Sequence, residues 1–310
     1  MIYPKLAESL RLERLTPPEG TVHMVLDTDT YNEIDDQFAV VYALLSKERV
    51  TVEAIYAAPF HNERSTRPAD GMEKSYDEVL RLLERLDINP DGFVFHGSRG
   101  FLSKPEIAQK SDAARDLIER ALSSQERPLY VVTTGAITNV ASAILLEPTI
   151  VERIVVIWLG GQPQHWPDAV HFNLKQDVHA ARVILDSGVP LIHMACDGVA
   201  SHMLTTVFEI EHHLAGRGAI GDYLAGIFRN YFDDHYGRAK VLWDISTVAW
   251  LVNPSWIRSQ ILPCPVLTEQ LTWRVEPGRH AMREALFVNR NAIFQDLFRK
   301  VERHAWQEPA

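Results

Sequence analysis

Five carboxylate side chains lie within ten residues near the start of this 310-residue sequence, in the stretch DTDTYNEIDD at positions 27–36. Like charges this close repel one another, so the grouping requires a compensating interaction. A hard divalent cation provides it, because Ca2+ takes about six to eight oxygen ligands, many of them from carboxylates. The residue types and their spacing therefore predict a divalent-cation site around Asp29, Asp35 and Asp36.

Two other interpretations of the acidic stretch stay open at this point. Asp35 and Asp36 precede the apolar run QFAVVYALLS, where the positive end of a helix dipole favours carboxylates. The opening DTDT also resembles the Asp-x-Asp-x-Thr motif of magnesium-dependent phosphohydrolases, with Asp29 as the nucleophile. An EF-hand and a zinc site are both disfavoured, because the EF-hand spacing is absent and no His or Cys accompanies the acids.

Short apolar, β-branched runs alternate with runs of helical period through the first two thirds of the chain. Strands are expected at 22–27, 51–58, 92–95, 129–134, 154–160 and 190–195, and helices at about 35–47, 72–86, 111–123, 136–147 and 176–187. This alternation predicts an α/β fold with an open, mostly parallel sheet flanked by helices. Such sheets bind ligands beyond the carboxyl ends of their strands, and the acidic stretch follows the first predicted strand.

The last third of the chain departs from this alternation. Residues 218–236 and 244–252 have helical patterns, 271–288 reads as two strands around a Pro-Gly turn, and 291–306 predicts an amphipathic helix. We expect the late β-hairpin to be an appendage of one domain, residues 1–310, because no linker or repeat divides the chain. The polar and aromatic segment 228–243 is interpreted either as a mobile flap over a site or as an ordinary surface helix end.

The composition narrows the functional classes. The formal net charge is -10, and no basic run is present, which disfavours a nucleic-acid or anionic-membrane partner. The two cysteines exclude a disulfide framework, and Cys196 is expected to be a buried, inert thiol. The sequence has no apolar signal core and no run long enough to span a bilayer, so a cytoplasmic protein is expected.

The acidic stretch also resembles the opening signature of the nucleoside hydrolases, which usually read Asp-x-Asp-Pro-Gly-x-Asp-Asp. Here the loop is two residues longer and lacks Pro-Gly. Five later segments resemble the family's motifs in the same order: YAAPFHNERS, VVTTGAITNVASAI, VVIWLGGQ, HFNLKQDVHAARVIL and LWDISTVAWLVNP. The resemblance covers roughly residues 22–300, and it identifies the chain as a divergent member with the fold of that family.

The resemblance implies a calcium-dependent N-ribohydrolase. It assigns the Ca2+ ligands to the carboxylates of Asp29, Asp36 and Asp244 and to the backbone carbonyl of Thr134. It also makes Asp29 the general base that activates water. Asp27 is expected to hold these ligands in position without binding the cation itself. Taken alone, Thr134 could simply end a strand and Asp244 could cap a helix.

The resemblance further implies a substrate pocket. Asp35, Asn62 and Asn173 match its ribose-binding positions, although Asn62 alone could be a turn residue and Asn173 a helix N-cap. Trp243 stands where many relatives have a His that protonates the leaving base. It is interpreted as a stacking wall for the base, or else as a core residue.

Three histidines are further candidate site residues, and two of them, His165 and His171, depart from the family's pattern. His171 replaces a sugar-binding Glu, and His165 stands near the position of another sugar-binding Asn. Both are therefore candidate substrate contacts, with an ordinary loop role as the alternative. His235, on the segment 228–243, is a candidate catalytic acid, with a solvated surface His as the alternative.

Together these residues predict a calcium-dependent hydrolase that cleaves the N-glycosidic bond of a ribonucleoside or a related furanosyl compound. Alternatives are a metal-bearing sugar- or nucleoside-binding protein with little turnover, and a hydrolase of another carbohydrate. The resemblance implies a small-molecule substrate and a homodimer or homotetramer. The sequence does not identify the nucleoside.

Overall fold

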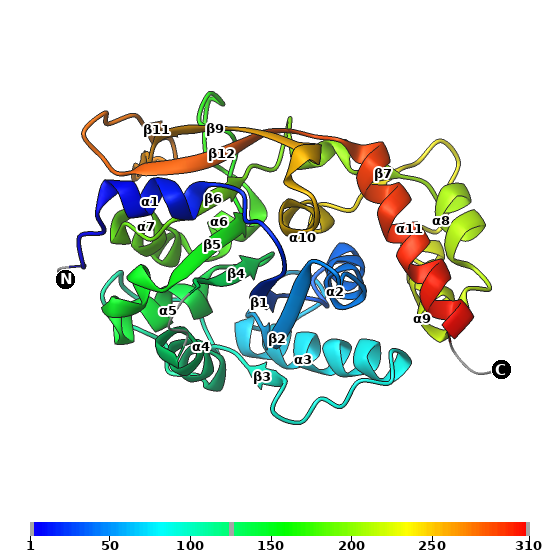
Figure 1. Ribbon diagram of the computed structural model, residues 1–310. Coiled ribbons are helices and arrows are strands. Elements are labelled where there is room, and N and C mark those ends of the chain that lie inside the picture. The colour runs from blue at the N-terminus through cyan, green and yellow to red at the C-terminus, as the bar shows by residue number, and fades with distance from the viewer. Residues whose placement is uncertain (1–2, 124–126, 308–310) are drawn as a thin grey trace.

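An eight-stranded sheet forms the centre of the protein in a computed structural model that describes residues 3–123 and 127–307 (Figure 1). Its strand order is β3-β2-β1-β4-β5-β6-β12-β9, and only β9 runs antiparallel to its neighbour. The strands are β1 (Val22–Thr28), β2 (Val50–Ala57), β3 (Val94–His96), β4 (Leu129–Thr133), β5 (Ile154–Leu159), β6 (Leu191–Met194), β9 (Ile257–Pro263) and β12 (Ala281–Val288). The predicted open, mostly parallel α/β sheet is confirmed.

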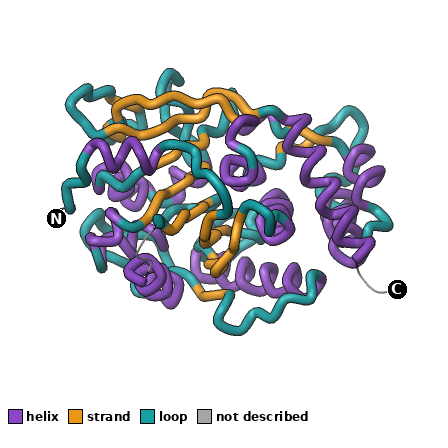
Figure 2. Tube along the Cα trace, in the orientation of Figure 1, coloured by secondary structure: helices purple, strands orange, loops and turns teal. Residues whose placement is uncertain are grey.

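Helices cover both faces of this sheet (Figure 2). They are α1 (Glu8–Leu15), α2 (Asp35–Leu45), α3 (Pro68–Arg85), α4 (Asp112–Ser123), α5 (Thr138–Leu146), α6 (Phe172–Gln176), α7 (Val178–Ser187), α8 (Val207–Leu214), α9 (Gly218–Arg229), α10 (Ile245–Val252) and α11 (Arg290–Gln307). Strand β1 shows why two layers are needed. Met24 and Leu26 pack with α2 and α10 on one face, whereas Val25 packs with α4 and α5 on the other. A strand buried on both faces reads as a continuous apolar run, as VHMVL nearly does.

The late strands pair differently from the predicted hairpin. The two strands of 271–288 are β11 (Trp273–Arg274) and β12, but they do not pair with each other. Instead β12 enters the central sheet between β6 and β9, while β11 pairs with β10 (Val266–Leu267). A second small ribbon joins β7 (Leu204–Thr205) to β8 (Lys240–Val241). The expected appendage is therefore wrong, because β12 gains more buried pairing inside the sheet than a local hairpin offers.

The predicted helix at 218–236 ends early, at Arg229. Asn230 caps it, and the following residues include two adjacent acids and Gly237, which has a positive φ of 66°. The final helices at 244–252 and 291–306 match α10 and α11. Within the described part of the chain both cysteines are free and buried, and no helix is long and apolar enough to cross a membrane.

The order of the strands places the acidic stretch at a branching point of the sheet. The strand β1 lies between β2 and β4, so the helices that follow β1 and β4 cover opposite faces. The carboxyl ends of these strands diverge there, which opens a crevice for a ligand. The register aligns Asp27 with Thr133, so the residues after β1 and β4 meet at one edge.

Asn139, in the first turn of α5, ties this edge together. Its Nδ2 donates to Asp27 Oδ1 at 2.7 Å and to the carbonyl of Ala57 at 3.3 Å. Its Oδ1 accepts from the backbone N and the hydroxyl of Ser98, at 2.7 and 2.8 Å. One fully buried amide thus links the ends of β1 and β2 to the chain after β3.

Replacing Asn139 with Ala should lower the free energy of unfolding by about 3 kcal/mol, because it leaves several buried groups without a hydrogen-bond partner. Urea denaturation followed by circular dichroism measures the change. The exposed Asn291→Ala is the matched control, with an expected change within about 0.5 kcal/mol. A loss below about 1 kcal/mol for Asn139→Ala would contradict this role.

Candidate functional site

A cavity of about 280 Å³ opens at the carboxyl edge of the sheet, beyond β1, β4 and β5. It is lined by carboxylates, amides, one His and apolar side chains: Asp29, Asn32, Glu33, Asp35, Asp36, Asn62, Glu63, Thr134, Leu159, His171, Phe172, Asn173, Trp243 and Asp244. Nine of the eleven residues that the sequence predicts for the site are among them. The cavity therefore gathers segments that are more than 200 residues apart in the chain.

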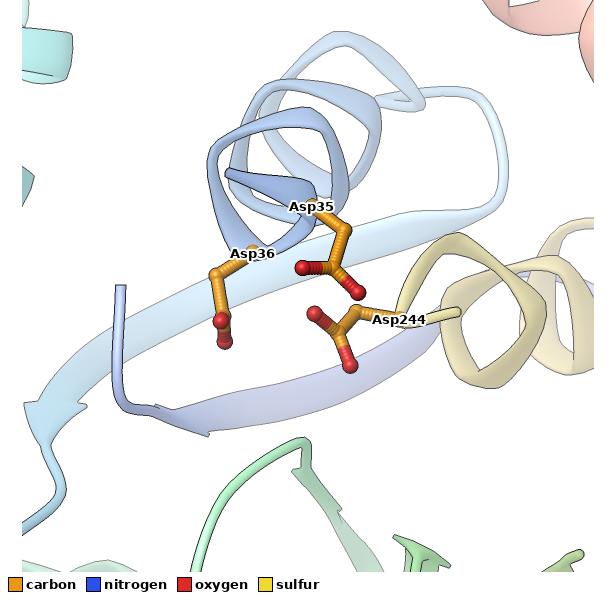
Figure 3. Close-up of side chains that lie close together, drawn as sticks. All are labelled: Asp35, Asp36 and Asp244. Atoms are coloured by element: carbon orange, nitrogen blue, oxygen red, sulfur yellow. The ribbon is translucent and has the colours of Figure 1, made fainter. Parts of the chain in front are cut away.

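Three carboxylates meet where two helices begin. Asp35 and Asp36 are the first residues of α2, and Asp244 is the N-cap residue of α10. An oxygen from each lies within 4.8 Å of the others, and Figure 3 shows the three side chains directed toward a common space. Asp244 makes no capping hydrogen bond, so its carboxylate is not used to cap α10. Both helix N-termini favour negative charge here.

Asp29 lines the same cavity from the loop that follows β1. Both of its carboxylate oxygens are buried, and neither accepts a hydrogen bond from any described residue. The backbone of Gly135 lies against this side chain, and a Cβ there would come within 2.8 Å of Asp29 Cγ. Gly135, the glycine of the TTGAITN segment, therefore leaves room for the Asp29 carboxylate because it has no side chain. A buried carboxylate without partners is costly, so this one points to a missing ligand.

Burial and mutual repulsion raise the pKa values of these acids. Desolvation raises the pKa of Asp36 to about 7, and Asp35 adds to the rise. Desolvation and the neighbouring carboxylates raise the pKa values of Asp29 and Asp244 well above their ordinary values. Thr28 and Thr134 donate hydroxyl hydrogen bonds to Asp36 Oδ1 but only partly offset the effect.

The site fits a hard divalent cation. Its donors are carboxylate, carbonyl and amide oxygens, whereas zinc would favour His or Cys ligands. A cation would also satisfy the bare oxygens of Asp29 and remove the repulsion that raises the pKa values. The triad contains Asp35, which the sequence assigns to the sugar, so Asp35 is a candidate ligand as well. The carbonyl of Thr134 accepts a hydrogen bond from Asn173, and its second lone pair remains available.

Lys240 is a site residue that the sequence analysis missed. It is buried, and its Nζ donates to Glu33 and lies 3.9 Å from Asp35 Oδ1. Burial lowers the pKa of Lys240, but the two carboxylates outweigh this and hold it above its ordinary value. Lys240 therefore supplies a fixed positive charge beside the triad. Its position just before LWD could have indicated the role, but a lysine in a polar segment usually faces solvent.

The two asparagines also interact with the protein around the cavity. Asn173 lies inside the short helix α6, and its Nδ2 donates to the carbonyls of Thr134 and Leu159. It is therefore not a helix N-cap. Asn62 accepts from the backbone N of Arg64 at 2.9 Å, as a turn residue does, and donates to Asn32 Oδ1 at 2.6 Å. Both side chains still line the cavity.

His171 and Trp243 form one wall of the cavity. Their rings meet edge to face, with centroids 5.6 Å apart. Burial lowers the pKa of His171, and its Nδ1 is buried without a partner among the described residues. Trp243 is half-buried, packs against the core and also lines the cavity, so its role as a stacking wall for the base stays a prediction. Its backbone N donates to Asp35 Oδ2 at 3.1 Å.

The structure does not bring His165 and His235 into this cavity. His165 is exposed on the loop before α6, where its ring contacts that of Trp166 edge to face. The Nε2 of His235 lies 2.8 Å from the carbonyl of Arg229, and its ring stacks on Phe228. His235 therefore packs against the end of α9. Neither side chain lines the cavity, so the structure gives no support to His165 as a substrate contact or to His235 as the acid, and both roles stay predictions.

The longer loop between Asp29 and Asp35 is fixed in place. Arg64, from the loop after β2, donates to the carbonyl of Glu33 at 2.8 Å and of Tyr31 at 3.3 Å. Its guanidinium also lies over the Tyr31 ring, 4.9 Å from the centroid. Thr30 is bonded to the carbonyl of Ser75 in α3 at 2.9 Å. The insertion is thus held by hydrogen bonds from two other segments, and its Asn32 and Glu33 line the cavity, as expected for a longer loop that alters the pocket floor.

Comparisons with known proteins give a family match for most of the chain. A family model described as inosine-uridine preferring nucleoside hydrolase matches residues 24–295. The pyrimidine-specific ribonucleoside hydrolase RihA of Salmonella typhimurium is 30% identical over 259 residues, which cover 74% of this chain and 79% of that protein.

Solved structures show the same fold. The purine-preferring ribonucleoside hydrolase from Gardnerella vaginalis superposes with a TM-score of 0.73 at 18% identity, covering 91% of this chain and 99% of that one. The inosine-uridine preferring nucleoside hydrolase from Bacillus anthracis gives a TM-score of 0.69 at 16% identity, with the same two coverages.

The raised pKa values predict how stability depends on pH when divalent cations are removed by a chelator. Asp27 and Asp36 have pKa values of about 7 in the fold, against about 4 in an unfolded chain. Between these values the unfolded chain releases protons that the fold retains, so stability falls as pH rises. The Tm in chelator should therefore decrease from pH 5 to pH 8.

Differential scanning fluorimetry at unit pH steps measures this trend. Asp36→Asn should flatten it, while Asp91→Asn, an exposed control, should leave it unchanged. A Tm that rises from pH 5 to pH 8 in chelator would show that the carboxylates are ionised without a cation.

Proposed function

The chain belongs to the inosine-uridine preferring nucleoside hydrolase family and is an N-glycosyl hydrolase, and we propose that it hydrolyses the N-glycosidic bond of ribonucleosides with the help of Ca2+. The observation that carries the proposal is the Asp29 carboxylate. It is buried and unpartnered beside the Asp35, Asp36 and Asp244 triad, in a cavity of a size suited to a sugar.

Asp29, Asp36, Asp244 and the Thr134 carbonyl would hold the cation, with Asp35 adjacent to them. When bound, Ca2+ supplies positive charge that neutralises the carboxylates and acidifies a coordinated water. The oxygen-only donor set supports this choice of metal over zinc.

Each side chain around the cation then has its own role in the hydrolysis. Asp29 accepts the proton from the attacking water, because both of its carboxylate oxygens are buried at the cavity and accept no hydrogen bond from a described residue. Cleavage passes through an oxocarbenium-like sugar, and the surrounding carboxylates favour its positive charge. Asp35, Asn62 and Asn173 bind the sugar hydroxyls, which discriminates against sugars that lack them. Trp243 and His171 form the wall beside the sugar.

A metal-bearing binding protein with little turnover is the second candidate. It is favoured by the two histidines that fail to reach a leaving group, His165 and His235. Incubation with a panel of purine and pyrimidine ribonucleosides, followed by a reducing-sugar assay, distinguishes the two. Release of ribose supports the hydrolase. No release from any member, together with saturable ribose binding, supports the binding protein.

Replacing Asp29 with Asn should lower kcat by about 10²- to 10⁴-fold, because the general base is lost while the shape is kept. Steady-state release of ribose from the best nucleoside of the panel measures it. Asp91→Asn is the matched control and should retain full activity. A decrease of less than about tenfold for Asp29→Asn would assign the proton transfer to another group.

Replacing Asp36 with Ala should abolish Ca2+ binding, because it removes a central carboxylate of the triad. Isothermal titration calorimetry on chelator-treated protein measures the stoichiometry, and circular dichroism shows whether the variant is folded. Stoichiometric Ca2+ binding by a folded Asp36→Ala protein would overturn the metal assignment.

We also propose that residues 1–310 form one domain and that the protein assembles as a homodimer or homotetramer. The first point is supported by the central sheet, which contains both β1 and β12. The second is expected from the family resemblance alone.

A further inference from the structure

Lys240 is a buried cation to which the proposed hydrolysis assigns no part. Its side chain is 8% exposed, and it lines neither the carboxylate cavity nor the larger cavity, of about 740 Å³, that adjoins it. Glu33 and Asp35 do line the carboxylate cavity, so Lys240 contacts that cavity through these two acids. A lysine is almost never buried so completely unless it is paired, and its partners therefore indicate its role.

The surrounding backbone and rings fix the place of this lysine. Lys240 lies on β8, whose pairing with β7 sets it opposite Thr205. Its Nζ donates to the Val241 carbonyl at 3.0 Å and lies 5.3 Å from the centre of the Tyr231 ring. The ammonium group is thus held in one position, where the attraction of the ring face adds to that of the acids.

Asp35 is the acid of the triad that this ammonium group faces. Its Oδ1 lies 3.9 Å from Lys240 Nζ, and its Oδ2 accepts from the backbone N of Trp243 at 3.1 Å. An oxygen of Asp35 nevertheless lies within 4.8 Å of oxygens of Asp36 and Asp244, and Figure 3 shows it beside Asp244. Asp35 is therefore near enough to bind the same cation as those two acids, unless another positive charge holds it back.

Asp35 differs in this respect from the other three acids of the site. Within the described part of the chain, no lysine or arginine forms an ion pair with Asp29, Asp36 or Asp244, whereas Lys240 lies beside Asp35. A divalent cation is drawn most strongly to the acids that have no positive counter-charge of their own. The charge of Lys240 thus separates Asp35 from the three acids that would hold the cation.

Lys240 should also act on the cation itself. Positive charges repel one another, and the repulsion is weakly screened between buried groups. When the cation is removed, in contrast, the ammonium group offsets part of the repulsion among the buried carboxylates. Lys240 is therefore expected to lower the affinity for Ca2+ and to stabilise the cation-free protein, two effects that a purely structural lysine would not combine.

We propose that Lys240 is a positioning residue that holds Asp35 apart from the cation, so that Asp35 stays free to accept a hydrogen bond from a sugar hydroxyl. Lys240 lowers the affinity for Ca2+ at the same time. Glu33 of the inserted loop completes the arrangement, because its carboxylate accepts from Lys240 Nζ and fixes the ammonium group beside Asp35. This inference rests on the proposed hydrolase function and its Ca2+ site.

Lys240→Met removes the charge and keeps most of the volume of the side chain. Isothermal titration calorimetry on chelator-treated protein should give a Kd for Ca2+ about tenfold or more tighter than that of the wild type. The Tm in chelator should fall by about 5 °C or more, and saturating Ca2+ should restore most of this loss. In Ca2+, the KM for the best ribonucleoside should rise about tenfold, because Asp35 then binds the cation instead of the sugar.

Lys300→Met is the matched control. The Lys300 side chain is 7% exposed and also pairs with two acids, Glu48 and Asp296. Glu48 follows the C-terminal end of α2, whereas Asp35 begins that helix, so this pair is remote from the site. Lys300→Met should lower the Tm equally with and without Ca2+ and leave both the Kd and the KM unchanged.

Two further variants separate charge from shape at position 240. Lys240→Arg keeps the charge and should keep the Kd for Ca2+ within about threefold of the wild-type value. Lys240→Gln removes the charge but keeps a hydrogen-bond donor for Glu33, so it should reproduce the tighter binding. Circular dichroism shows which variants are folded, and Lys240→Gln replaces Lys240→Met in the comparison if the latter is not.

Two results would overturn the inference while the hydrolase function stands. One is an unchanged or weaker Kd for Ca2+ in the folded variant that lacks the charge, as a purely structural role of Lys240 predicts. The other is an unchanged KM in that variant, because Asp35 would then not have left the sugar. Absence of Ca2+ binding or of ribose release in the wild type would instead overturn the proposed function, and the inference with it.

Discussion

The repulsion among buried carboxylates at one edge of the sheet is the constraint on which the site depends. Asp29, Asp35, Asp36 and Asp244 are all buried, and the described residues that act against their charge are Lys240, the hydroxyls of Thr28 and Thr134 and the backbone N of Trp243. The fold must therefore hold them together against their own electrostatic energy. It does so by placing them on rigid elements: the ends of strands and the first turns of helices.

The packing of α2 against α10 is central to this arrangement. Both helices are almost entirely buried, and their N-termini meet at the carboxylates (Figure 3). Because each helix is apolar on all sides, neither can rotate to move its acid toward water. The same apolar runs that build the core thus fix Asp36 and Asp244 beside one another. Stability of the core and assembly of the site are two consequences of one packing arrangement.

Many of the strands and the positions of the acidic residues could be predicted from the sequence. The strands from 22 to 195 and the positions of the acids follow from local apolar runs and from motifs whose order matches a family. The pairing of β12 with β6 and β9 could not be predicted, because it depends on partners far away in the chain. For a related reason, the sequence did not indicate that Lys240 lies at the site or that His235 lies outside it. Whether a polar residue in 228–243 faces a site or a helix end depends on where α9 stops, and Arg229 ends it earlier than the pattern indicates.

The inserted loop is where this chain differs most from the family's usual motif, and the structure gives the difference a physical meaning. Without Pro-Gly, the loop would be expected to be loose, yet Arg64 binds its carbonyls and Asn62 binds Asn32. A wall fixed in this way separates a small cavity rich in carboxylates from a larger one lined by aromatic rings. Asn32 and Glu33 of this loop line both cavities, so the loop borders the carboxylates on one side and the aromatic side chains on the other.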